Sequence, residues 1–175
     1  GGEYEQNCVV CTSLSKTFNL AGLCFATIII PNDALRAKFQ DTMSSYGFKH
    51  TSRFGPVAHE AAYRRGGEWL DELLQVIKGN YEFFKAFMAK YFPKVVVTEL
   101  EGTYMAWFNC TSLGMNDNEL RDFLTDECLL YLDNGVEFGP AGSGYQRINL
   151  ACPRKTLSDA LERLLAGAKA RGIME

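Results

Sequence analysis

The sequence predicts the end of an α/β region, then a long helical segment, then a compact α+β region. Three observations predict this order. Two short apolar runs, Cys8–Cys11 and Ala26–Ile30, are typical of buried strands. Apolar residues at helical spacing then continue to position 92, and after Pro93 the pattern changes to strands with short helices. The expected divisions are residues 1–56, 57–92 and 93–175.

In the first region, the run Cys8–Cys11 opens into hydroxyl-rich residues just before Lys16, so this lysine lies near a strand end. Ligand sites in α/β sheets tend to collect there. After Asn32, apolar residues recur every four positions and predict a helix that ends near Gly47. In the second region, Gly66 and Gly67 predict a break or kink before a stripe long enough to link two domains, although a simple bundle helix has the same pattern.

The third region alternates strands and helices. Strands are expected at 95–100, 104–110, 129–132 and 145–150. Asn116 followed by Glu119 resembles a capping box for one helix, while Thr156 and Gly172 mark the expected start and end of the last helix.

Composition excludes several functions. A net charge of -3 with scattered Lys and Arg gives no basic stripe for nucleic acid. The most apolar stretch, residues 18–31, is shorter than the roughly 20 residues that span a bilayer, so no membrane partner is expected. The six cysteines lie among apolar residues and are interpreted as reduced thiols of a cytoplasmic protein. Cys8 and Cys11 form a C-x-x-C, but a strand points them to opposite faces, and no metal site is predicted.

Lys16 and Arg147 are the candidate site residues. An apolar setting favours a neutral, nucleophilic lysine amine, and the neighbouring hydroxyls of Ser13 and Ser15 can bind a phosphate or phenolate oxygen. The alternative for this segment is a capped turn. Arg147 shares one strand face with Tyr145, below glycines 135, 139, 142 and 144, where its planar fork could bind a carboxylate. The alternative for Arg147 is a structural ion pair.

The segment from Ser13 to Leu23, SLSKTFNLAGL, resembles the lysine segment of the fold-type I pyridoxal-phosphate-dependent aminotransferase superfamily. It is most similar to the cystathionine beta-lyase-like branch, the MalY and PatB type. Matching segments follow in the family's order along nearly the whole chain. They are Ala61-Ala62-Tyr63, Glu68–Asp71, Gly102-Thr103-Tyr104 with Trp107, and Arg147–Arg154.

The resemblance implies that Lys16 holds pyridoxal phosphate as an internal aldimine and moves the α proton of an amino-acid substrate. It also implies that Ser13 contacts the cofactor phosphate, with Ser15 as a second candidate, and that Arg147 binds the substrate carboxylate. The implied reaction is C–S beta-lysis or transamination in a homodimer, with Tyr46–Phe54 near the subunit seam.

The chain departs from the family in three ways. Cys24 stands where many aminotransferases have a phosphate-binding arginine, and Asn109 stands where Asp is more usual. Only fifteen residues precede Lys16, whereas the family places much of its cofactor site before the lysine strand. The sequence therefore predicts the C-terminal portion of such an enzyme, whose two buried-type strands would present apolar edges to water. The alternative is a catalytically inert structural or interaction module.

Overall fold

A computed structural model describes residues 2–48 and 52–173 of the chain, so three positions of the predicted seam segment Tyr46–Phe54 lie outside the description. The chain divides into two compact units, Gly1–Glu72 (unit 1) and Leu73–Glu175 (unit 2). The division falls inside helix α3 (Gly67–Tyr91), within the segment that the sequence analysis predicts to link two domains. The exact domain limits stay a prediction.

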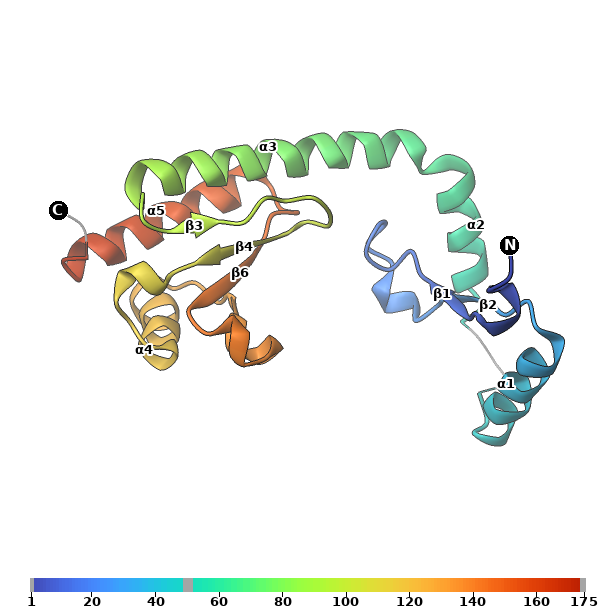
Figure 1. The fold of residues 1–175 in the computed structure, drawn as a ribbon. Coiled ribbons are helices and arrows are strands. Elements are labelled where there is room, and N and C mark those ends of the chain that lie inside the picture. The colour runs from blue at the N-terminus through green and yellow to red at the C-terminus, as the bar shows by residue number, and fades with distance from the viewer. Residues whose placement is uncertain (1, 49–51, 174–175) are drawn as a thin grey trace. The chain divides into compact units, whose positions relative to one another are not determined.

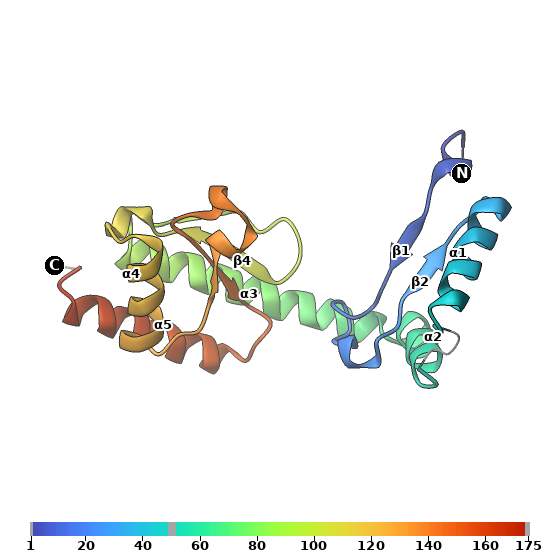
Figure 2. The same cartoon turned by 90° about the horizontal axis from the view of Figure 1, so that it is seen from below.

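Unit 1 contains a two-stranded antiparallel sheet, in which β1 (Val10–Thr12) lies beside β2 (Thr27–Ile29) (Figure 2). Short 3-10 turns, Glu5–Asn7 and Ala21–Leu23, precede and follow β1. The predicted apolar edges are found, because Val10 is 45% and Ile29 50% exposed. A two-stranded sheet cannot cover its own faces, so its apolar side chains face solvent in this unit.

Helix α1 (Asp33–Ser45) follows β2, as predicted, and the Asn32 side chain caps it by accepting a hydrogen bond from the Leu35 amide at 3.0 Å. Helix α2 (Gly55–Arg65) ends at Gly66, and α3 begins at the next residue. The predicted break at Gly66 and Gly67 is therefore confirmed. The Phe18 ring occupies the space that a Gly66 side chain would need, so glycine is required here by close packing.

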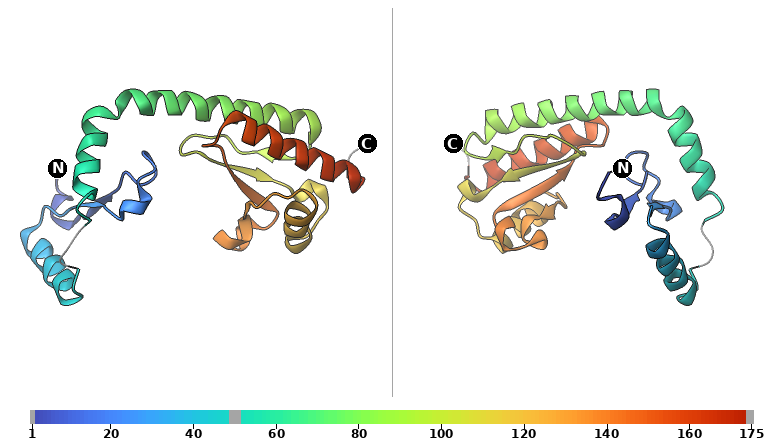
Figure 3. Two further views of the ribbon diagram at one scale, coloured as in Figure 1. Left: turned by 180° about the vertical axis from the view of Figure 1, so that it is seen from behind. Right: turned by 45° about the vertical axis from the view of Figure 1, so that its right-hand side comes forward.

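Unit 2 is built on a four-stranded antiparallel sheet in the order β3-β4-β6-β5. Helices α3 and α5 (Arg154–Ala170) lie against the same face of the sheet (Figures 1 and 3). The strands are β3 (Val96–Val97), β4 (Met105–Asn109), β5 (Asp133–Asn134) and β6 (Tyr145–Asn149). None of the helices in the described part of the chain combines the length and apolarity needed to cross a membrane.

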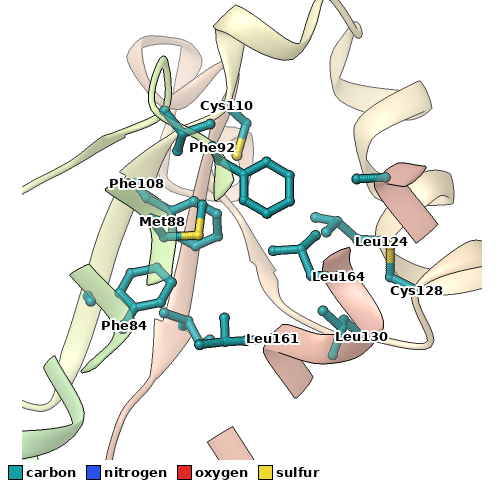
Figure 4. Close-up of a cluster of buried hydrophobic side chains, with 14 of the residues drawn as sticks. Phe84, Met88, Phe92, Phe108, Cys110, Leu124, Cys128, Leu130, Leu161 and Leu164 are labelled. Carbon is teal, nitrogen blue, oxygen red and sulfur yellow. The ribbon is translucent and has the colours of Figure 1, made fainter. Parts of the chain in front are cut away.

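The core of unit 2 lies between this sheet and these helices (Figure 4). Strand periodicity supplies one wall, because alternate residues of β4 and β6 are buried. The rings of Phe84 on α3 and Phe108 on β4 meet edge to face at 5.3 Å. The thiols of Cys110 and Cys128 also belong to this core. Unit 2 therefore has a continuous apolar core of its own.

A buried amide ties α3 to the chain that connects β6 with α5. The side chain of Asn80 is 1% exposed and donates hydrogen bonds to the carbonyls of Leu150 and Cys152, both at 2.8 Å. It also accepts a hydrogen bond from Nε of Arg154 at 2.7 Å. The Arg154 guanidinium in turn stacks on the ring of Phe83 at 4.7 Å. The start of α5 is thus fixed by polar contacts as well as by the core.

The segment between β4 and β6 departs from the prediction. Helix α4 (Asp117–Asp122) has the predicted capping box of Asn116 and Glu119, and a π-helical turn (Phe123–Glu127) follows it. The predicted strand at 129–132 is wrong, because Leu129 adopts a left-handed backbone with φ 53°, and only Asp133 and Asn134 pair with β6. The last helix begins at Arg154 rather than Thr156, with Pro153 preceding it.

The glycine-rich segment folds into two 3-10 turns, Gly135–Phe138 and Pro140–Gly142. The backbones of Gly135 and Gly142 are in such close contact that neither position has room for a side chain. Asp117 at the start of α4 holds the end of this segment by accepting hydrogen bonds from the Ser143 hydroxyl at 2.8 Å and the Gly144 amide at 2.7 Å. The glycines therefore shape the loop that leads into β6.

Candidate active site

Lys16 lies in a tight turn that follows β1. The turn is closed by two backbone hydrogen bonds, from the Phe18 amide to the Leu14 carbonyl at 3.0 Å and from the Leu20 amide to the Ser15 carbonyl at 3.1 Å. Lys16 itself is exposed, and its amine forms no hydrogen bond or ion pair with any residue that the structure describes. The apolar setting expected for this amine is therefore not found in unit 1, although the amine is free to react with a carbonyl compound.

The two predicted serines have different local roles. The Ser13 hydroxyl donates to the Phe25 carbonyl at 3.1 Å and accepts from the Ser15 amide at 3.1 Å, so it joins the turn to the chain before β2. The Ser15 hydroxyl has no hydrogen-bond partner within residues 2–48 and 52–173. Ser13 therefore supports the capped-turn interpretation, while Ser15 keeps a free hydroxyl beside Lys16. A phosphate contact by Ser13 would require its hydroxyl hydrogen to rotate away from Phe25.

Buried contacts hold the lysine turn against α2 and the start of α3. Leu14 is 6% exposed, and its amide donates to Nε2 of His59 on α2 at 3.4 Å. The ring of His59 contacts Phe25 edge to face at 4.5 Å. Phe18 stacks on Trp69 of α3 with ring centroids 5.7 Å apart. The apolar residues of the motif around Lys16 thus fix the position of the turn within unit 1.

Arg147 lies on β6, directly opposite Trp107 on β4 and Asp133 on β5. As predicted, it shares with Tyr145 the face of β6 that points away from the core, while Gln146 and Ile148 are buried. Its Nε donates to Oδ2 of Asp133 at 2.9 Å, and Nη2 lies 2.8 Å from the same oxygen. Asp133 is therefore the partner that the alternative interpretation, a structural ion pair, requires.

One aromatic ring contacts this arginine, and a second ring packs against the first. The Arg147 guanidinium lies over the ring of Phe138 at 4.4 Å from its centroid, and Phe138 meets Trp107 edge to face at 5.2 Å. Arg147 also borders a hollow of about 480 Å³ between the chain leading into β5 and helix α5. The side chain is 27% exposed, so a solute can reach it.

The predicted site residues fall into two groups, each within one unit. Ser13, Ser15 and Lys16 share one turn of unit 1, and Arg147 belongs to unit 2. Sequence reasoning missed two residues that contact these groups. His59 left no signal, because a single histidine within a helical pattern has many explanations. Asp133 directly follows the wrongly predicted strand at 129–132, so the sequence pattern does not indicate that it pairs with Arg147.

A model of the family "aminotransferase class I and II" matches residues 2–164 of the chain. The chain therefore belongs to this family. The superfamily predicted from the motif around Lys16 is thereby confirmed, and the motif lies inside the matched range.

Several curated proteins that are similar to the chain are named cystathionine beta-lyases. The chain is 38% identical over 158 residues to cystathionine beta-lyase PatB of Bacillus subtilis, and 31% identical over 160 residues to protein MalY of Escherichia coli. These alignments cover 90% and 91% of the chain but only 41% of each relative. The chain thus spans about two fifths of the length of the curated relatives it matches.

Solved structures agree with this assignment. Cystalysin from Treponema denticola, described as containing a pyridoxal 5'-phosphate cofactor, superimposes with a TM-score of 0.93 and 31% identity. A pyridoxal-phosphate-bound C-S lyase from Staphylococcus hominis gives a TM-score of 0.82 and 27% identity. These likenesses cover 98% and 93% of the chain and 43% and 41% of those structures. The predicted α/β and α+β parts of a transferase-like fold are therefore confirmed.

Proposed function

We propose that this chain is the C-terminal part of a pyridoxal-phosphate-dependent enzyme that acts on amino acids, with the cofactor attached to Lys16. The observation that carries the proposal is the exposed Lys16 amine, which extends from a turn whose backbone is held on both sides. The hydrogen bond of Leu14 to His59 and the stacking of Phe18 on Trp69 supply this support. Preorganisation of this kind lowers the entropic cost of binding a cofactor in one orientation.

The residues beside Lys16 fit pyridoxal phosphate. An amine without an acceptor suits the cofactor aldehyde, and the free Ser15 hydroxyl suits an anionic oxygen. Ser13 becomes a second donor if its hydroxyl hydrogen leaves the Phe25 carbonyl. Because Cys24 brings no positive charge to this turn, the phosphate must obtain its remaining contacts from other groups.

The cofactor, when bound, acts as an electron sink for negative charge at the substrate α carbon. In the proposed reaction, Lys16 Nζ accepts the α proton of the amino acid and later returns a proton. Arg147 binds the α-carboxylate through two parallel hydrogen bonds from its planar guanidinium. The ammonium group of a lysine could not form such a pair. Arg147 therefore orients the substrate, and Lys16 moves the proton.

We place C–S beta-lysis ahead of transamination, because the relatives of the cystathionine beta-lyase-like branch lead the similarities. Both reactions begin with removal of the α proton by Lys16. Beta-lysis continues with loss of a thiolate from the β carbon, and transamination continues with return of a proton to the cofactor. The competing function is an inert structural or interaction module. It is favoured by the exposed apolar strands of unit 1, which are typical of a surface that another polypeptide covers.

Borohydride trapping tests the proposal. The chain is incubated with pyridoxal phosphate, reduced with sodium borohydride and digested, and the mass of each lysine-containing peptide is measured. We expect a phosphopyridoxyl group on the Lys16 peptide at low cofactor concentration, together with a near-visible absorbance band before reduction. This label should vanish in Lys16→Ala and persist in Lys38→Ala, which removes an exposed lysine from α1.

Two outcomes contradict the proposal. Label spread evenly over the exposed lysines would show that Lys16 does not react preferentially with pyridoxal phosphate. A folded chain without any label would favour the inert module. Release of a thiol and pyruvate from L-cystathionine by the cofactor-loaded protein would support beta-lysis, whereas accumulation of the aminated cofactor would support transamination.

A further inference from the structure

The Arg147 guanidinium is held on one edge and one face. Both the Nε and the Nη2 groups approach the same oxygen, Oδ2 of Asp133, at 2.9 and 2.8 Å. The flat face of the guanidinium lies over Phe138. Nη1 forms no hydrogen bond with any of the residues in the described ranges. One edge of the planar fork is therefore occupied, and the edge that carries Nη1 is open.

Backbone pairing fixes where these two partners lie. Asp133 stands opposite Arg147 in the β5–β6 ladder, so its carboxylate reaches the guanidinium from the neighbouring strand. Phe138 ends the 3-10 turn that begins at Gly135, and that turn is anchored by the backbone contact between Gly135 and Gly142. The orientation of the guanidinium is thus set by partners on β5 and on the 3-10 turn Gly135–Phe138.

Geometry distinguishes an orienting pair from a neutralising one. A carboxylate that occupied the Nη1–Nη2 edge would block bidentate binding of another carboxylate, whereas Asp133 occupies the Nε–Nη2 edge. The pair is also partly solvated, with 27% of the arginine side chain and 39% of the aspartate side chain exposed. Solvent weakens the attraction between the two charges, so the pair does not prevent Arg147 from interacting with a second anion as well.

We propose that Asp133 is a positioning residue that, together with the ring of Phe138, orients Arg147 so that its Nη1 edge receives a monocarboxylate ligand. The orientation follows from the contacts of Arg147, and the ligand rests on the function proposed above. The ion-pair and ligand-binding interpretations of Arg147 are then compatible, because each uses a different edge of the same group.

Nuclear magnetic resonance of the arginine side chains tests this in the full 175-residue chain. The Nε–H signal of Arg147 is assigned through its loss in Arg147→Lys, and its exchange with water is measured. Sodium propionate is then added as the probe, with propanamide as an uncharged control of the same shape. Three variants are compared: Asp133→Ala, Asp133→Asn and, as a surface ion-pair control, Asp122→Ala, whose partner is Arg121.

In the parent chain we expect a sharp, slowly exchanging Arg147 Nε–H signal and a saturable response to propionate but not to propanamide. Asp133→Ala should broaden the signal and weaken propionate binding by about threefold or more, as loss of a partly exposed ion pair predicts. Asp133→Asn keeps an acceptor oxygen and removes the charge, so it should restore the signal and bind propionate at least as tightly as the parent. Asp122→Ala should behave like the parent.

The outcomes separate the two proposals. An unchanged Nε–H signal in Asp133→Ala would overturn the positioning role. Tighter propionate binding in both the Ala and the Asn variants would overturn it too, because the only effect of Asp133 would then be to repel the propionate carboxylate. The expected Nε–H behaviour without any propionate response in the parent would support the orientation by Asp133 and contradict the carboxylate-binding role of Arg147 in the proposed function.

Discussion

Phe84→Ala is expected to lower the free energy of unfolding of unit 2 by about 3–5 kcal/mol, the usual cost of removing a fully buried phenylalanine. Phe84 is 0% exposed and meets Phe108 edge to face, so the substitution leaves a cavity between α3 and β4. Met88, Phe108 and Leu161 lie beside Phe84 in the core (Figure 4), and close-packed side chains of this kind collapse only partly into a cavity.

Denaturant unfolding measures this effect if it is followed by Trp107 fluorescence in a Trp69→Phe background, since the chain has two tryptophans. Trp107 lies on β4 in unit 2 and therefore reports on that unit. Tyr131→Ala, at a position of unit 2 that is 93% exposed, is the matched control and should change the stability by less than about 0.5 kcal/mol. Equal shifts in the two variants would contradict the assignment of the core.

Asn80→Ala is expected to lower the free energy of unfolding by roughly 2–4 kcal/mol, because it leaves the buried carbonyl of Leu150 and two partly buried polar groups without their partners. The carbonyls of Leu150 and Cys152 lose their donor, and Nε of Arg154 loses its acceptor. An unpaired polar group that water cannot reach lowers the free energy of unfolding by more than the net contribution of its hydrogen bond.

Asn80→Asp separates the two halves of this network. Aspartate can still accept from Arg154 but cannot donate to the two carbonyls, so it should remain well below the parent in stability. Arg154→Ala removes the contact with Asn80 and the stacking on Phe83 but keeps both carbonyl contacts, so it should be milder than Asn80→Ala. The same Trp107 denaturation midpoint serves for all three variants, and near-parent stability of Asn80→Asp would show that the carbonyl contacts contribute little.

Local patterns predicted the elements that depend on local physics. The Asn116–Glu119 capping box, the break at Gly66 and the alternation of β6 around Arg147 all depend on residues near one another in sequence. Such features are decided by capping hydrogen bonds, backbone freedom and side-chain alternation. They are visible in a single sequence for that reason.

Two features could not be predicted in the same way. The chain from Leu129 to Leu132 has the composition of a strand, but the π-helical turn before it and the left-handed Leu129 delay pairing until Asp133. The carboxylate partner of Arg147 was therefore hidden. Likewise, the contact of His59 with Leu14 joins residues 45 positions apart, and nothing in a helical pattern marks such a pair.

The position of Cys110 and Cys128 inside the unit 2 core governs how the protein reacts with alkylating reagents. Burial raises the pKa of the Cys110 thiol to about 12 and, with a smaller contribution from Glu127, that of Cys128 to about 11. At neutral pH almost none of either group is thiolate, the form that attacks maleimides and iodoacetamide. Cys11 and Cys24 are exposed on unit 1. Fluorescent dyes or spin labels will therefore react first with Cys11 and Cys24 on the unit that carries Lys16, and more slowly with the partly buried Cys8 and Cys152, while Cys110 and Cys128 inside the core stay unmodified.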